Sequence, residues 1–177
     1  MVSLEPGAGE VRDPAYLRAK EVAFRFLAYR ARSESEVRRR LSRRHGPQVI
    51  DEVITTLKQQ GYLDDASFAR QWRNQRERLR PRGQRALRQE LLRLGVSAEA
   101  VKEALEDFDD ADNAYRAGQT LASRLTETGY TKFRQRLWSH LQRRGFDSAV
   151  IGDTVGRLWR ELSDPLHCGI DGGQDEK

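Results

Sequence analysis

Two pairs of adjacent aspartates, Asp64–Asp65 and Asp109–Asp110, are the residues whose type and spacing could support chemistry. Paired carboxylates can hold a divalent cation or divide the roles of general acid and base. A metal site needs at least three ligands, and neither pair has a histidine or cysteine near it in the sequence. The alternative is that each pair is a structural joint, and we favour this alternative.

Other catalytic or cofactor-binding motifs are not found. The sequence lacks a glycine-rich phosphate loop, a nucleophile elbow and zinc-ligand spacing, and the histidines follow no motif. The basic stretch "RPRGQR" (Arg80 to Arg85) has no following Lys-Ser/Thr pair, so it is better explained as a turn that begins a helix. The single cysteine, Cys168, cannot form an internal disulfide and is expected to be an inert thiol. We expect no enzymatic activity, no cofactor and no metal.

Composition favours thin helical layers over one thick core. Only 37% of the 177 residues are hydrophobic and 33% are charged, and the mean hydropathy is −0.80. The net charge of +5 is a mild excess, so the distribution of charge matters more than its total. No apolar run approaches the roughly 20 residues of a membrane span, and the N-terminus has no signal-peptide pattern. These features predict a cytoplasmic protein that does not bind membranes, and we expect it to be a monomer.

A repeat of about 50 residues organises the chain. Three blocks align at this offset, namely "VRRRLSRRHG" (Val37 to Gly46), "LRQELLRLGV" (Leu87 to Val96) and "LWSHLQRRGF" (Leu137 to Phe146). A second apolar pattern follows each block, namely "VIDEVITTL" (Val49 to Leu57), "AVKEALEDF" (Ala100 to Phe108) and "VIGDTVGRL" (Val150 to Leu158). Apolar spacings of three and four residues are those of a helix face. A third helical stretch precedes each block, so the unit is predicted to have three helices.

The predicted fold class is all-α, with three tandem three-helix repeats of about 50 residues in an elongated, curved array. The predicted boundaries are a disordered tail at 1–12, repeats at 13–63, 64–108 and 109–162, and a second disordered tail at 163–177. A single globular bundle of nine helices is the alternative. Residues expected to begin or end helices are Ser33, Gly61, Asp64, Asp65, Asp109, Asp110, Gly145 and Asp147.

Arginine accumulates in the middle helices and in the segments that lead to them. The candidate binding residues are Arg38, Arg39, Arg40, Arg43, Arg44, Arg73, Arg76, Arg80, Arg82, Arg85, Arg88, Lys132, Arg134, Arg136, Arg143 and Arg144. Regular stacking of the repeats would place these cations in a stripe suited to phosphates or to an acidic protein groove. The alternative is a set of solvated faces balanced by weak surface ion pairs. The three tryptophans are expected to pack in the core rather than to stack on bases.

Four ordered segments carry a resemblance to a known family. They are "SESEVRRRL" (Ser33 to Leu41), "GYLDDASFAR" (Gly61 to Arg70), "RGQRALRQEL" (Arg82 to Leu91) and "LQRRGFD" (Leu141 to Asp147). The sequence resembles the RecX family of RecA regulators over about Ala19 to Leu162. Asp147 stands where the family usually has serine, and His45-Gly46 replaces a Gly-Phe pair. Neither departure threatens the fold that the resemblance implies.

The resemblance implies a non-enzymatic regulator that binds RecA filaments on single-stranded DNA. Family members are thought to lie in the filament groove and to inhibit ATP hydrolysis, strand exchange and the co-protease activity that triggers the SOS response. The implied partners are the RecA filament and single-stranded DNA, with double-stranded DNA as a further candidate.

Two other classes of function stay open at the level of sequence. Basic three-helix units also describe helix-turn-helix and Myb-like modules, so the chain could bind DNA on its own. Myb-type repeats carry tryptophans at regular intervals, which Trp72, Trp138 and Trp159 do not. A carboxylate-metal enzyme would require Asp64 or Asp109 to be essential for an activity without being needed for helicity.

Overall fold

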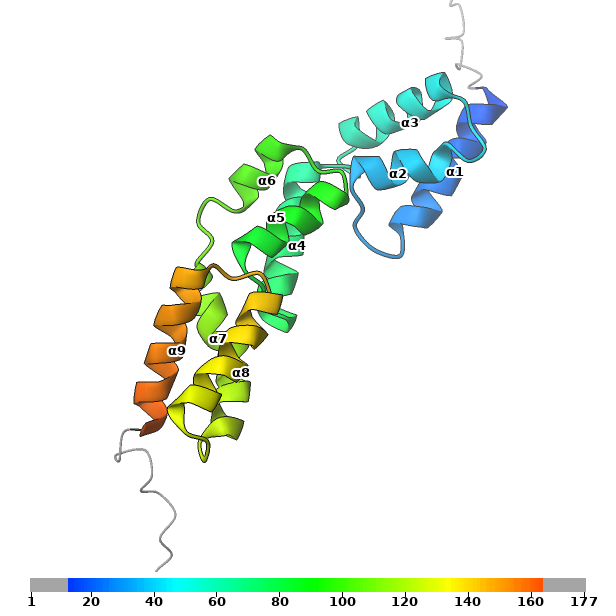
Figure 1. The fold of residues 1–177 in the computed structure, drawn as a ribbon. Coiled ribbons are helices and arrows are strands. Elements are labelled where there is room, and N and C mark those ends of the chain that lie inside the picture. Colours follow the sequence, from blue (N-terminus) through cyan, green and yellow to red (C-terminus); the bar gives the residue numbers. More distant parts are fainter. Residues whose placement is uncertain (1–12, 164–177) are drawn as a thin grey trace, which may run out of the picture. The chain divides into compact units, whose positions relative to one another are not determined.

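The computed structural model describes residues 13–163, where regular secondary structure is helical throughout (Figure 1). This range contains α1 (Pro14–Leu27), α2 (Glu34–Leu41), α3 (Pro47–Gln59), α4 (Asp65–Leu79), α5 (Gln84–Arg93), α6 (Ala98–Ala104), α7 (Asp110–Ala122), the 3-10 helix η1 (Ser123–Leu125), α8 (Tyr130–Arg143) and α9 (Ser148–Ser163). The all-α prediction is confirmed, whereas the number of three repeats and their curved arrangement stay predictions. The predicted tails, with Cys168, lie outside the described residues, except for Ser163 in α9.

The chain forms two compact units. The first contains the residues up to Phe68 together with Leu94–Val96, and the second contains Ala69–Arg93 and the residues from Ser97 onward. Within the described residues, no helix is long and apolar enough to cross a membrane. The division between the two compact units falls inside α4, so it does not test the repeat boundaries predicted after residues 63 and 108. Those boundaries remain predictions.

Helices α1, α2 and α3 enclose the core of the first unit. Its buried residues recur every three or four positions, as a helix face requires. They are Tyr16, Ala19 and Ala23 from α1, Val37 and Leu41 from α2, Ile50, Val53, Ile54 and Leu57 from α3, and Leu63. The apolar repeat read from the sequence therefore faces the interior.

The ends of helices in the first unit use local hydrogen bonds. Ser33 and Glu36 form a capping box, in which Ser33 Oγ accepts from Glu36 N–H at 3.2 Å and Glu36 Oε2 accepts from Ser33 N–H at 3.3 Å. Pro47 occupies the first turn of α3. Gly61 has φ of 74°, and the following Tyr62 N–H donates to Leu57 O at 2.8 Å, which ends α3.

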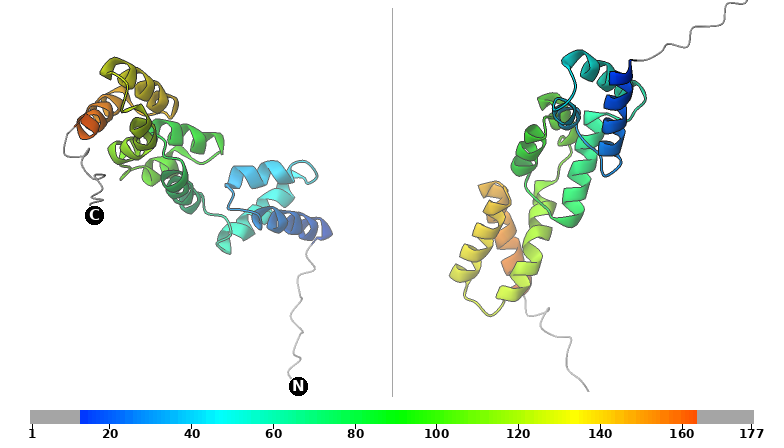
Figure 2. Two further views of the ribbon diagram at one scale, coloured as in Figure 1. Left: turned by 90° about the horizontal axis from the view of Figure 1, so that it is seen from below. Right: turned by 90° about the vertical axis from the view of Figure 1, so that its right-hand side faces the viewer.

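Helices α7, α8 and α9 share a core in the second unit and lie together in both views of Figure 2. Helix α8 contributes Phe133, Leu137 and Leu141, and α9 contributes Ile151, Val155 and Leu158. Helix α7 presents small residues to them. A Cβ at Gly118 would lie 3.0 Å from Leu158 Cδ1, so glycine permits the close approach of α7.

Both aspartate pairs have structural roles, and the two residues of each pair divide these roles in the same way. The first aspartate of each pair is the N-cap of its own helix: Asp64 Oδ1 accepts from Ala66 N–H at 2.9 Å, and Asp109 Oδ1 accepts from Asp112 N–H at 2.9 Å. The second aspartate reaches the start of an earlier helix. Asp65 Oδ1 accepts from Glu34 N–H at the start of α2 (2.8 Å), and Asp110 Oδ1 accepts from Gln84 N–H at the start of α5 (2.9 Å).

We call these contacts the Asp65 joint and the Asp110 joint. Burial raises the pKa of both carboxyls, although the backbone N–H bonds favour their ionised forms. Each carboxylate satisfies an N–H that the first turn of a helix leaves without a partner. Sequence reasoning had not distinguished the two aspartates of a pair, and the structure gives them different roles.

A second contact accompanies each joint. In the first unit, Ser33 Oγ donates to Leu94 O. In the second unit, the Gly83 N–H donates to Arg144 O at 3.0 Å. Gly95 and Gly145, which follow Leu94 and Arg144, both have positive φ, of 83° and 82°. These glycines end the helical segment that carries the accepting carbonyl.

Helix α6 is shorter than its apolar pattern predicts. The pattern extends to Phe108, but the helix ends at Ala104. Glu103, Glu106 and Asp107 surround this end, and acidic side chains are unfavourable at the negative end of the helix dipole.

Candidate functional site

The predicted binding arginines divide into anchored and exposed groups. Arg38 belongs to the anchored group: its Nε donates to Glu34 Oε1 at 2.7 Å and its Nη1 to Asp51 Oδ1 at 2.6 Å. Lys58 donates to the other oxygen of Glu34 at 2.9 Å. Because these contacts join α2 to α3, Arg38 supports the first unit rather than presenting a free guanidinium.

Glu90 on α5 neutralises two more of the predicted arginines. Arg76 Nε lies 2.9 Å from Glu90 Oε2, and Arg82 Nη1 lies 2.7 Å from Glu90 Oε1. The indole N–H of Trp72 also donates to Glu90, at 3.0 Å. This carboxylate is mostly buried, so the cluster holds α4 against α5 and pairs both guanidinium groups.

Arg73 and Arg144 are held by backbone carbonyls. Arg73 Nη1 donates to Ala104 O at the end of α6, at 3.0 Å, and its Nε pairs with Glu77. Arg144 Nη1 donates to Pro81 O at 3.2 Å. Arginine at a helix C-terminus satisfies carbonyls that lack an N–H partner, and Arg73 does so for α6.

The remaining predicted cations are exposed, and none makes an ion pair with a described residue. They are Arg39, Arg40, Arg43 and Arg44 in the first unit, and Arg80, Arg85, Arg88, Lys132, Arg134, Arg136 and Arg143 in the second unit. Arg134 is partly engaged, because its guanidinium lies 5.1 Å from the centre of the Trp138 ring. These residues, rather than the anchored ones, are available to a partner.

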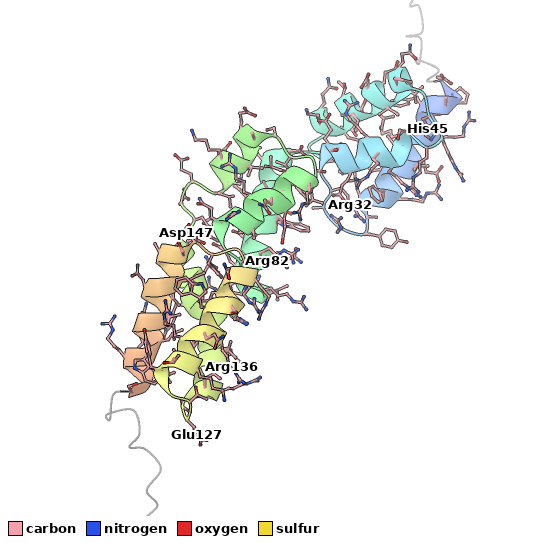
Figure 3. The ribbon with its side chains drawn as sticks, in the orientation of Figure 1. Arg32, His45, Arg82, Glu127, Arg136 and Asp147 are labelled. Carbon is pink, nitrogen blue, oxygen red and sulfur yellow. The ribbon has the colours of Figure 1, made fainter. Side chains whose placement is uncertain are left out.

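Helix α8 gathers three of the exposed cations on one face. Lys132, Arg136 and Arg143 follow one another at spacings of four and seven residues, which places them within about 40° around the helix axis. Arg136 projects to the outside of the second unit (Figure 3). We call these three residues the α8 basic face.

A cleft of about 490 Å³ lies beside this face, between α5 and the ends of α8 and α9. Exposed Arg85, Arg93 and Arg143 line it together with half-buried Trp138. Its carboxylates are Glu90, which is paired, and Asp147, which caps α9 by accepting from Ala149 N–H at 2.9 Å. The cleft therefore offers guanidinium groups and an aromatic wall, a combination that suits phosphodiesters or acidic side chains.

Sequence reasoning did not select Arg93 for this site. The signal was present, because Arg93 lies 50 residues before Arg143 and so occupies the equivalent position of the repeat. Trp138 has two roles in the structure: it packs against the core of α7, α8 and α9, as expected, and it also lines the cleft.

The carboxylates of the described residues do not assemble a metal site. No group of three or more His, Cys, Asp or Glu side chains is placed to hold an ion within residues 13–163. Burial and the neighbouring Arg144 and Arg143 lower the pKa of His140, which therefore stays neutral near pH 7. The aspartate pairs have the capping roles described above.

Comparison with known proteins gives two family matches. Residues 19–57 match the model for "RecX, first three-helix domain", and residues 64–105 match that for "RecX, second three-helix domain". A crystal structure of RecX from Lactobacillus salivarius has a TM-score of 0.73 at 19% identity, over 81% of this chain and 96% of that chain. At this identity the likeness supports the fold alone.

Two relatives named "Regulatory protein RecX" match most of the chain. That of Chlorobium phaeobacteroides is 33% identical over 144 residues, which is 81% of this chain and 95% of the relative. That of Mycolicibacterium smegmatis is 33% identical over 160 residues, which is 85% of each chain.

The fold defines an all-helical protein with three-helix domains, and exposed cations lie on its surface. Within that class, the chain belongs to the RecX family of regulatory proteins. The resemblance inferred from four sequence segments is thereby confirmed.

Proposed function

We propose that the chain binds the RecA filament on single-stranded DNA and inhibits its ATPase, strand-exchange and co-protease activities without being an enzyme itself. Membership of a regulatory family supports this class of function. The observation that carries the proposal is the sorting of the arginines. Carboxylates or carbonyls hold Arg38, Arg73, Arg76, Arg82 and Arg144, while the α8 basic face has no acidic partner among the described residues.

The exposed cations suit a filament because its surface offers both carboxylates and DNA phosphates. Guanidinium groups bind either anion through two parallel N–H bonds. On this proposal, the anchored arginines keep the helices in place, and Arg85, Arg88 and the α8 basic face make the contacts. The protein would act in the cytoplasm as a monomer.

The test is to add the purified chain to RecA on single-stranded DNA with ATP and to measure ATP hydrolysis. The double variant Arg136→Gln with Arg143→Gln should need about tenfold more protein for the same inhibition, because two charged contacts are lost. Its matched control is Arg18→Gln with Arg25→Gln on α1, two exposed arginines whose loss changes the net charge equally. The control should inhibit as the wild type does.

Absence of any effect of the wild type on ATP hydrolysis, at amounts equal to RecA, would overturn the proposal. If both double variants inhibit ATP hydrolysis equally weakly, the effect is due to net charge, and the α8 basic face does not make the specific contact.

Binding to DNA without RecA is the second candidate function. The cleft between α5 and α8 favours it, because Trp138 and its surrounding arginines could accommodate a base and its phosphate. Such binding would weaken steeply with salt and would leave RecA activities unchanged.

A further inference from the structure

A second cleft in the second unit has an unusual concentration of positive charge. It lies between the α4–α5 connection, α7 and the end of α8, and has a volume of about 360 Å³. Arg80, Arg116, Arg124 and Arg144 line it together with His140, and no acidic residue is among the described residues that line it. It shares no lining residue with the cleft beside Trp138. We call it the four-arginine cleft.

Two of the four guanidinium groups are fixed before any ligand arrives. Arg144 donates from Nη1 to Pro81 O at 3.2 Å and from Nε to His140 Nε2 at 3.0 Å. Arg116 donates from Nη1 to Glu77 O at 3.1 Å and from Nη2 to Asn113 Oδ1 at 2.9 Å, and its Nε lies 2.8 Å from Asp112. Such fixed donors lose little conformational freedom when they bind an anion.

The other two arginines are exposed at the cleft. The side chains of Arg80 and Arg124 have no ion pair or hydrogen bond within residues 13–163. They can therefore close on a ligand held by the fixed pair. Fixed and mobile guanidinium groups together can surround an anion from several sides.

Electrostatic repulsion within the cleft is compensated only at Arg116, which pairs with Asp112. Burial and the charges of Arg82 and Arg80 lower the pKa of Arg144. Burial and Arg144 also lower the pKa of neutral His140, whose Nε2 lies 3.1 Å from Ala117 O. One ring nitrogen cannot donate to this carbonyl and accept from Arg144 at once, so the tautomer of His140 decides which of the two hydrogen bonds forms.

The cleft has room for more than a bare anion. Its volume lies near the lower end of the range for small-molecule sites, about 300–1,000 Å³. Leu79, whose exposed fraction is 71%, and Leu121 add apolar surface at its edge. This mixture fits a phosphate carried on an organic group better than a protein carboxylate, because a phosphate offers three oxygens to several guanidinium groups.

We propose that the four-arginine cleft binds a phosphate group of a nucleotide, supplied either by a free nucleoside diphosphate or by the backbone of single-stranded DNA. This site does not require the filament regulation proposed above, since either ligand can be tested without RecA. Arg116 and Arg144 position the phosphate, and Arg80 and Arg124 close on it.

The experiment uses isothermal titration of the full chain with three probes: inorganic pyrophosphate, ADP and a short oligothymidine. The variant Arg80→Gln with Arg124→Gln should bind pyrophosphate about tenfold more weakly than the wild type, or weaker still. The matched control, Arg18→Gln with Arg25→Gln on exposed positions of α1, should bind as the wild type does. Thermal unfolding of each variant verifies its fold.

A second variant, Thr120→Glu, places a carboxylate at the exposed cleft wall and should abolish binding by occupying the arginines. Displacement of pyrophosphate by the oligothymidine would identify DNA as the source of the phosphate, and displacement by ADP alone would identify the nucleotide. The proposal is overturned if none of the three probes binds, or if the two double variants weaken binding equally.

Discussion

The Asp65 joint and the Asp110 joint use the same carboxylate contact but different second contacts. At the first, the Ser33 hydroxyl donates to Leu94 O. At the second, the Gly83 backbone N–H donates to Arg144 O, and a Cβ on Gly83 would overlap the carbonyl of Gly145. The second contact of the first joint thus depends on the hydroxyl of Ser33, whereas that of the second joint depends on the absence of a side chain at Gly83. Two equivalent pairs of aspartates therefore serve two joints that should tolerate different substitutions.

The largest effect is expected from Gly83→Ala. The added methyl group meets backbone atoms that cannot rotate away, so the free energy of unfolding should fall by about 2–3 kcal/mol. Denaturant unfolding measures this change. The control is Gly156→Ala in α9, where a Cβ would have no neighbour within 4 Å and alanine should stabilise the helix by about 0.5–1 kcal/mol. Equal stability of the two variants would contradict the close backbone contact at the Asp110 joint.

Ser33→Ala should have the next largest effect, about 1–2 kcal/mol, because it removes both the N-cap and the bond to Leu94 O. Ser97→Ala is the comparison. Ser97 caps α6 through Ala100 N–H, so its loss should cost only the capping energy of about 1 kcal/mol. If the two substitutions cost the same in denaturant unfolding, the Ser33–Leu94 contact adds nothing.

The carboxylate contacts should be worth about 1 kcal/mol each. Asp65→Ala and Asp110→Ala remove the acceptors for Glu34 N–H and Gln84 N–H. Chemical unfolding should show similar losses for the two variants, since the contact is the same at both joints. If only one of the two variants loses stability, the two carboxylate contacts differ in energy although their geometry is the same.

The smallest effect is a dependence on pH. Burial raises the pKa of Asp65 and Asp110, so ionisation of these groups opposes folding above their folded pKa. An asparagine keeps the accepting oxygen without the charge, so Asp110→Asn should be at least as stable as the wild type at pH 7. The stability difference should narrow as pH falls through the folded pKa, where the wild-type carboxyl becomes protonated. If the stability difference between Asp110→Asn and the wild type widens as the pH falls, the pKa of Asp110 is not raised in the folded protein.

Much of the fold could be predicted because it depends on local spacing. The offset of 50 residues located α2, α5 and α8, and the apolar positions Val37, Leu87 and Leu137 are all buried. Caps such as Ser33 act through bonds to residues two or three positions away, so the sequence contains their signal. Helix α6 ends at Ala104, before its apolar pattern ends, and the acidic residues at its C-terminus disfavour a longer helix.

The division of the arginines could not be predicted. Arg82 and Arg85 look alike in sequence, but only Arg82 reaches Glu90. The position of Glu90 depends on the packing of α4 against α5, in which Glu90 also pairs with Arg76, 14 residues away. The role of Asp110 has the same origin, since its N–H donor, Gln84, lies 26 residues earlier. Contacts over such distances depend on tertiary structure rather than on local pattern.

The most direct test of the account compares two targets for the same chain. Fluorescence anisotropy can measure how the labelled chain binds the RecA filament and how it binds the same single-stranded DNA without RecA, over a range of salt concentrations. We expect the filament to be bound more tightly than bare DNA at every salt concentration, and Arg136→Gln with Arg143→Gln to weaken filament binding. Equal binding to filament and bare DNA would contradict the account and would favour a protein that binds DNA on its own.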